Sequence, residues 1–293
     1  MIKQILAISS IVLFSSAISA AEIIPYGSFN YKWSNDENSS GKSYSKLEDN
    51  GSSIGVEVID LGVEGDTITG FAKLEVGVDT DDSGSDTFDS KLAYVGLDSN
   101  MGALSVGRQS HPFADNIGGK TSIFNVYGGS SDWNYASRSS NSMKFSTTQS
   151  GLTLDTIGIV DGSSTNTNAF DEFEVTISTK LFGSDVSVGY ADDVNSDISY
   201  WGVAGSTDLG PLTMSSSYTI YDAATDKYGL EATASYSIFS VGYGDKEGTG
   251  VAYTAGVSHD LNESVSVYAE GEMKDLDSGS DTTSWSIGSK LTF

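Results

Sequence analysis

The chain has 293 residues and contains no cysteine. This absence excludes a disulfide-stapled scaffold and any metal site built from thiolates. Basic residues are also scarce, because 15 Lys and Arg stand against 40 Asp and Glu and the formal net charge is −25. Nucleic-acid binding needs a basic surface, so we expect no nucleic-acid partner. The acidic excess suits a surface or a lumen that attracts cations.

Long uncharged apolar runs are absent beyond residue 21. The first segment differs, because Lys3 precedes the apolar stretch Ile5–Ile18 and small residues follow. This order predicts a signal peptide, residues 1–21, cleaved after Ala20 or Ala21, and a mature domain of residues 22–293. An N-terminal membrane helix is the alternative, although the stretch is short for a span. If the mature chain lies in a membrane, it crosses as strands.

Apolar residues are only 38% of the chain and alternate with polar ones. At the C-terminal end, Trp285, Ile287, Leu291 and Phe293 share one face, while Ser, Lys and Thr share the other. One face of such a strand meets an apolar medium and the other does not. An antiparallel β-barrel with lipid outside and water inside requires this pattern.

Polar punctuation divides the mature chain into alternating segments. Short turns alternate with longer acidic, Ser-rich loops at 34–50, 79–89, 161–170 and 275–281, an asymmetry typical of outer-membrane barrels. A weak break near Ile238–Phe239 leaves fourteen strands as an alternative to sixteen. The sixteen expected strands lie near 24–33, 51–60, 67–78, 90–97, 103–109, 138–148, 152–160, 171–182, 185–192, 197–207, 211–221, 227–237, 239–244, 250–259, 264–274 and 283–293.

The longest stretch without strand alternation runs from Ser110 to about Ala136. A connection of that length in a compact domain is usually functional or disordered. Inside a barrel wide enough for an aqueous channel, it would narrow the pore. Its candidate charged groups are Asp115, Lys120 and Asp132.

Basic residues on the wall are expected to face this loop. Arg138 and Lys144 share the polar face of the following strand, and Lys73 and Lys91 lie on the polar faces of two earlier strands. Simple alternation turns Arg108 toward lipid, so we expect a β-bulge or the strand's end to turn it inward. Acid on the loop opposite base on the wall would create a transverse field that orients polar solutes. The alternative is that these are solvated charges paired across strands.

Metal sites and catalytic sites are not expected. The segment 79–84 is similar to the start of a calcium loop, but its twelfth place is Ser90 instead of a bidentate Glu. The two histidines, His111 and His259, lie in the long loop and at a turn, so a zinc pair is not expected. We therefore predict no cofactor and no enzymatic activity. Whether the acidic loops 79–89 and 275–281 bind divalent ions stays open.

Three stretches resemble the general diffusion porins of Gram-negative bacteria. Ile24–Phe29 resembles the family's first strand. Ala93–Leu97 with Gly102–Gln109, followed by Pro112–Asn116, resembles its most recognisable signature and the start of the loop that enters the pore. The terminal Phe293 resembles the signal read by the outer-membrane assembly machinery.

The resemblance implies a sixteen-stranded outer-membrane β-barrel, usually a homotrimer, in contact with lipid and lipopolysaccharide. Its third long loop would bend inward, and ions and small hydrophilic solutes would diffuse passively, with a preference for cations from the acidic excess. A solute-specific porin with a binding site at the constriction is the main alternative, because Phe124, Tyr127, Trp133 and Tyr135 could form an aromatic slide. A barrel hydrolase, which needs a His beside a nucleophile, and a secreted β-rich adhesin are two competing hypotheses.

Overall fold

The computed structural model describes residues 21–62, 67–81, 87–129, 136–160, 169–193, 198–222 and 226–293. The predicted signal peptide lies outside these residues, apart from Ala21. None of the helices in the described ranges is long and apolar enough to cross a membrane.

The described chain is almost entirely β-strand, with two short helical segments between β6 and β7. The helical segments are α2 (Pro112–Asn116) and η2 (Gly118–Lys120). The strands are β1 (Glu22–Glu37), β2 (Ser43–Asp49), β3 (Ser53–Leu61), β4 (Ile68–Val78), β5 (Phe88–Ser99), β6 (Gly102–Ser110), β7 (Arg138–Gln149), β8 (Leu152–Ile159), β9 (Glu172–Leu181), β10 (Ser184–Asp193), β11 (Ile198–Leu209), β12 (Leu212–Asp222), β13 (Lys227–Tyr236), β14 (Phe239–Lys246), β15 (Gly250–Asn262), β16 (Val265–Leu276) and β17 (Thr282–Thr292).

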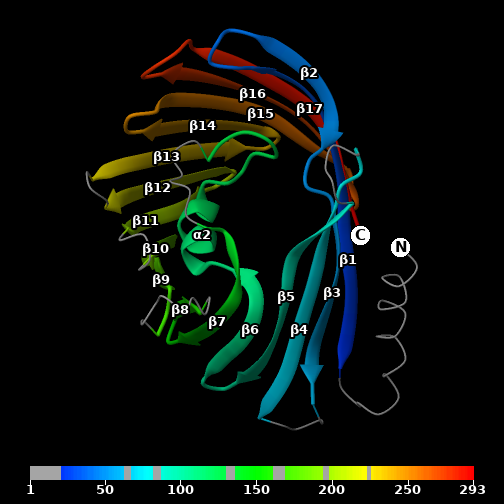
Figure 1. Cartoon of the computed structure of the whole chain (residues 1–293), viewed down its shortest axis with the longest axis vertical. Helices are drawn as coiled ribbons and strands as arrows, with labels where there is room; N and C mark the ends of the chain where they lie inside the picture. The colour runs from blue at the N-terminus through cyan, green and yellow to red at the C-terminus, as the bar shows by residue number, and fades with distance from the viewer. Residues whose placement is uncertain are drawn as a thin grey trace.

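The strands form one closed antiparallel barrel (Figure 1). From β3 to β17 each strand pairs with the next, and β17 pairs with β1. β2 pairs with Tyr31–Glu37 and β3 with Glu22–Ser28, so these two strands occupy one position beside β1. The described residues thus give sixteen strand positions, and the predicted all-β barrel is confirmed.

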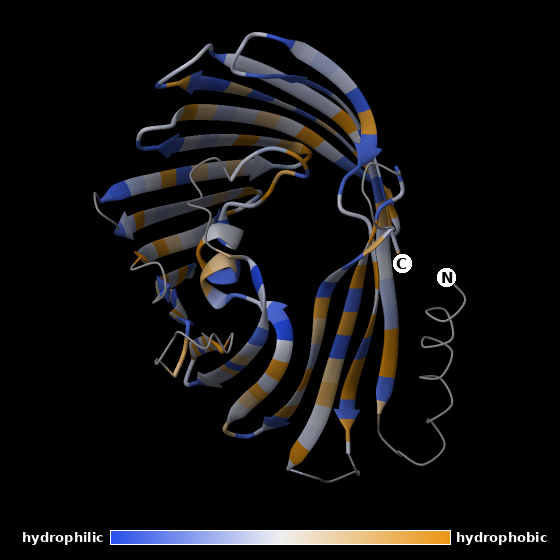
Figure 2. Ribbon diagram, viewed as in Figure 1, coloured by the Kyte–Doolittle hydropathy of each residue, from blue (hydrophilic) through white to orange (hydrophobic). Residues whose placement is uncertain are grey.

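The two faces of the wall differ in polarity. Val95, Leu97 and Ile287 are more than half exposed on the outer face, whereas Thr176 and Ser217 are buried on the inner face. Figure 2 shows the resulting bands of apolar and polar residues along the strands. Apolar residues thus face outward and polar residues face inward, which is the reverse of a soluble protein. This arrangement suits a barrel with lipid outside and water inside.

Two-residue turns join the strands at one rim, at 100–101, 150–151, 182–183, 210–211, 237–238 and 263–264. At Ser150–Gly151 both φ angles are positive, 53° and 82°. Positive φ at both positions gives the turn geometry that matches the twist of a hairpin. The weak break before Phe239 is one of these turns, which is why sixteen strands and not fourteen result.

The long loop expected at 34–50 is mostly strand, so that part of the prediction is wrong. β1 continues to Glu37 and β2 returns from Ser43. Trp33 pairs with Leu47 across this hairpin, and Lys32 Nζ lies 3.3 Å from Glu48 Oε1. Such cross-strand pairs stabilise the hairpin, which the polar, Ser-rich sequence did not predict.

The barrel is closed beside the C-terminal residue. Phe293 N–H donates to Gly27 O at 3.1 Å, and Gly27 N–H donates to Phe293 O at 3.0 Å. A Cβ atom on Gly27 would lie 2.7 Å from Phe293 Cζ and 2.8 Å from Ser53 O. The seam therefore requires glycine at position 27.

Gly27→Ala should destabilise the barrel by about 1–3 kcal/mol, because the added methyl group overpacks the seam. We expect the detergent-extracted variant to lose its compact electrophoretic mobility at a lower temperature than the wild type. Gly271→Ala is the control, since its new Cβ would meet no atom closer than 3.6 Å, with Ser284 O the nearest. Equal transitions for Gly27→Ala and the wild type would contradict this account of the seam.

Candidate functional site: the constriction loop

Residues 111–137 connect β6 to β7 and are called the constriction loop here; residues 130–135 of it lie outside the described ranges. Its helical part lies inside the barrel, beside the wall opposite β3–β5 (Figure 1). Along this path α2 contacts β8, β9 and β10, and η2 contacts β11 and β12. The predicted inward fold is confirmed.

An apolar seat holds the first part of the loop. Phe113 and Ile117 are both 0% exposed and pack against Ala191 and Ala204 of the wall. A Cβ atom on Gly202 would lie 2.7 Å from Ile117 and 2.8 Å from Phe113, so the wall needs glycine there. Burial of each large apolar side chain contributes about 1.5–3 kcal/mol, which is enough to keep α2 on the wall.

A second glycine seat lies further along the wall. A Cβ atom on Gly242 would lie 2.7 Å from Phe124 Cε2, and one on Gly256 would lie 3.4 Å from the same ring. Phe124 therefore packs onto β14 and β15 and follows the wall as Phe113 does.

Carboxylates of the wall bind the loop through its backbone. Glu270 on β16 accepts the N–H of Asn125 at 2.6 Å, of Val126 at 2.9 Å and of Tyr127 at 3.3 Å. The Asn125 side chain adds a fourth donor at 3.0 Å. Consecutive backbone N–H groups form a concave anion site, and hydrogen bonds to a charged acceptor are stronger than neutral ones. The wall supplies the charge and the loop supplies neutral donors.

Two further glutamates hold the middle and the root of the loop. Glu231 on β13 accepts Gly129 N–H at 2.7 Å and Thr121 Oγ1–H at 3.1 Å. Glu174 on β9 accepts Phe113 N–H at 3.0 Å. Both carboxylates are buried, so each hydrogen bond replaces one lost to water.

His111 lies at the root of the loop, with Nδ1 2.6 Å from Glu174 Oε1 and 3.5 Å from Glu172 Oε1. Burial lowers the pKa of His111, but the hydrogen bond to Glu174 and the charge of Glu172 outweigh it, so the pKa is raised. In the described ranges, these three side chains form the one group whose donor atoms lie close enough together to hold a metal ion. Two ligands of a tetrahedral zinc lie about 3.3 Å apart. The 2.6 Å contact is a hydrogen bond instead.

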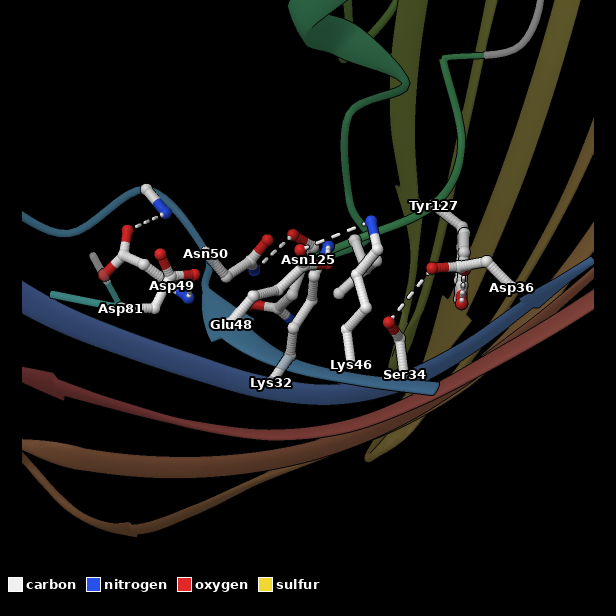
Figure 3. Close-up of polar contacts among 12 residues, drawn as sticks. Lys32, Ser34, Asp36, Lys46, Glu48, Asp49, Asn50, Asp81, Asn125 and Tyr127 are labelled. Atoms are coloured by element: carbon white, nitrogen blue, oxygen red, sulfur yellow. Dashed lines mark hydrogen bonds and ion pairs between the residues drawn. The ribbon is translucent and has the colours of Figure 1, made fainter. Parts of the chain in front are cut away.

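The tip of the loop reaches the first strands (Figure 3). Tyr127 Oη–H donates to Asp36 Oδ1 at 3.1 Å, and Asn50 Nδ2–H donates to Asn125 O at 3.0 Å. The loop thus follows the inner wall from β7 to β1. Within the described ranges, the inner faces of β3, β4 and β5 receive no hydrogen bond from it; we call these faces the open wall.

Charged residues of the open wall pair with one another and with Tyr26 of the neighbouring strand β1. Lys73 Nζ lies 3.5 Å from Glu57 Oε2 and 4.8 Å from the centre of the Tyr26 ring. Tyr26 Oη–H donates to Glu75 Oε2 at 3.0 Å. Two acids, one base and a phenol therefore share this surface.

Lys144 is the predicted wall base that meets the loop. Its Nζ lies 3.7 Å from Asp115 Oδ2 and donates to Ser110 O at 3.2 Å. Burial inside the lumen raises the pKa of Asp115, although half of its side chain is exposed, and Lys144 acts in the opposite direction. Of the other predicted loop charges, Lys120 ends η2 and Asp132 lies outside the described residues.

Three other predicted wall bases lie on β5, β6 and β7. The bulge expected at Arg108 lies instead in β7, where Gly107 pairs with Ser142 and Gln109 with Ser139. Arg108 pairs with Ala93, on the face of Val95 and Val106, and its guanidinium donates to Ser90 O and Ser140 Oγ.

The same bulge shifts the alternation of β7. Arg138 pairs with Ser110 and so does not share the inner face of Lys144. Lys91 stands at an irregularity between β4 and β5 and donates to Gly51 O at 2.8 Å. Among the predicted loop and wall charges that lie in the described ranges, the structure brings together Lys144 and Asp115.

Sequence reasoning did not find the glutamate anchors. Glu174 was visible as a polar-face residue of a strand, but its partner is a backbone N–H in another part of the chain. No local sequence pattern predicts such a contact. A carboxylate on an inner face, where uncharged Ser and Thr would suffice, is the one available signal.

The model of the family described as Gram-negative porin matches residues 7–279. The chain belongs to this family. Its barrel is thus an outer-membrane structure that crosses the membrane many times, as predicted. A search of curated proteins gives no match.

Solved structures share the fold. The Salmonella typhi OmpF complex with daunomycin has 16% identity and a TM-score of 0.75, over 94% of this chain and 98% of that one. The trimer form of OmpT, an outer-membrane protein of Vibrio cholerae, has 16% identity and a TM-score of 0.74, over 94% and 100%. A mutant of the Rh. blastica porin has 18% identity and a TM-score of 0.68, over 93% and 100%.

Glu270→Gln should release the tip of the loop, because the amide loses the charge that the N–H groups of Asn125–Tyr127 bind. Hydrogen bonds to a charged group contribute roughly 1.5–3 kcal/mol, so amide hydrogen exchange at the tip should accelerate about 10- to 100-fold. Mass spectrometry of the tip peptide would measure this. Glu263→Gln, in an exposed turn at the other rim, is the matched control. Unchanged exchange in Glu270→Gln would refute the anchoring role.

Proposed function

We propose that this porin is a passive channel for ions and small hydrophilic solutes, with a preference for cations. The observation that carries the proposal is the anchored loop, whose described part follows one side of the lumen and makes no hydrogen bond to the polar open wall on the other. No covalent chemistry is needed for such a pore, so we infer a transporter and not an enzyme.

The preference for cations follows from the charges near the passage. Glu57, Glu75 and Asp115 stand against Lys73 and Lys144. Behind the loop, the anchoring glutamates bind mostly neutral N–H groups, so their negative charge still acts on the lumen. Because low-dielectric walls focus the field, cations should be enriched. The transverse field between loop and wall is proposed only at Lys144 and Asp115.

A general pore fits the aromatic residues better than a solute-specific one. Phe124 packs on Gly242, and Tyr127 donates its hydroxyl hydrogen to Asp36. These two rings serve the docking of the loop, so they are not arranged as a slide. Trp133 and Tyr135, also named for a slide, lie outside the described residues.

Assembly and partners are part of the proposal. A trimer form is named for the similar Vibrio cholerae protein, which supports a homotrimer here. The exposed apolar outer face supports contact with lipid and lipopolysaccharide, and Phe293 at the seam is proposed as the contact for the assembly machinery.

Reversal potentials in planar bilayers would test the selectivity. In a KCl gradient the wild type should show the sign of cation preference. Asp115→Asn and Glu75→Gln should each move the potential toward zero, because each removes a negative charge beside the passage, whereas Glu263→Gln should not. Anion preference of the wild type would refute the selectivity, and absence of any conductance would refute the channel.

A further inference from the structure

His111 is the first residue of the constriction loop after β6, so the contacts of its side chain fix the loop's root. The imidazole is 0% exposed, and its Nδ1 lies 2.6 Å from Glu174 Oε1. The other oxygen of Glu174 accepts Phe113 N–H, in the first turn of α2, at 3.0 Å. One wall carboxylate therefore holds both the imidazole and the start of the helix.

Two carboxylates face this single imidazole, since Glu172 Oε1 is 3.5 Å from Nδ1. When both carboxylates are ionised, the group carries one net negative charge with a protonated imidazole and two with a neutral imidazole. The neighbouring elements add Lys144 on β7, which is engaged with Asp115 of α2, and the acids Asp155 on β8 and Asp193 on β10. The surroundings are thus acidic on balance and favour the charged imidazole.

The opposite nitrogen of the ring limits this preference. Nε2 is buried and has no hydrogen-bond partner in the part of the chain that the structure describes. A buried N–H without a partner is costly, so burial opposes the charge that the carboxylates favour. The nearby carboxylates favour the protonated imidazole and burial favours the neutral one, so the imidazole can take up or lose a proton.

We propose that His111 is a positioning residue of the pore: its imidazolium, held by Glu174 and Glu172, fixes the root of the constriction loop, and loss of its proton loosens the root and alters the pore. The inference rests on the proposed channel function. It adds a proton-binding group to a pore whose loop is also held by glutamates that accept hydrogen bonds from N–H and O–H donors.

The direction of the pH effect follows from the sign of the shift. The pKa of His111 is raised above its ordinary value of about 6.5. The stabilisation by the ion pair is therefore complete below that value and is lost as the pH rises through the raised pKa. Above it, Glu172 and Glu174 repel each other without a cation between them.

A titration of the imidazole by NMR would test the proton site without any need for conductance. The chain has two histidines, so His259→Gln, which removes an exposed ring, leaves His111 as the one signal. We expect His111 in micelles to titrate above about pH 6.5. Glu172→Gln should move the midpoint to lower pH. A His111 that is neutral at pH 6 would overturn the proposal.

Single-channel recordings across the same pH range would test the effect on the pore. Wild type and His259→Gln should show more frequent current fluctuations at alkaline pH, His111→Gln should show no such pH dependence, and Glu172→Gln should move the onset to lower pH. If His111→Gln keeps the wild-type pH profile, the positioning role is refuted. Should His111→Gln fail to fold, the shift in Glu172→Gln still decides. Absence of channels at every pH would refute the proposed function, while the NMR titration would still decide the proton site.

Discussion

Backbone hydrogen bonding in a medium without water is the constraint on which this structure depends. Hydrocarbon offers no partner for an exposed N–H or C=O, so strands in lipid must close on themselves. The pairing of β1 with β17 meets this demand, and the hydrogen bonds between Gly27 and Phe293 complete it. Once the wall is closed, every second side chain points inward, and the inner face becomes a surface on which a polar loop can be held.

The loop is held by a combination of burial and charge. Phe113 and Phe124 need glycines in the wall, because a side chain there would occupy the space of the rings. Glu231 and Glu270 need backbone N–H groups, because a buried carboxylate without donors would be too costly. Neither contact alone defines the path. Together they keep the loop against the wall from β8 to β16.

The fold could be predicted well from the sequence, and the site only in part. The period-two pattern predicted all sixteen strand positions because it reports the medium on each side of the wall. It missed β2, whose polar residues pair with the upper half of β1 beyond the alternating segment. It also assumed unbroken alternation along β7, whereas the bulge near Ser140 changes the face of Arg138. The pairing of Lys144 with Asp115 and the role of Glu270 depend on where the loop lies in three dimensions. That path is set by long-range packing, which single-strand patterns do not contain.

The anchoring of the tip has a consequence for sequence change. Glu270 binds main-chain amides, and main-chain amides are the same whatever residue carries them, proline excepted. Val126 binds Glu270 through its main-chain N–H, so its side chain can be exchanged while that hydrogen bond is kept. Evolution or design can change the side chains of the loop at such positions while the attachment of the loop to the wall stays in place. What the pore admits can therefore change separately from how the pore is built.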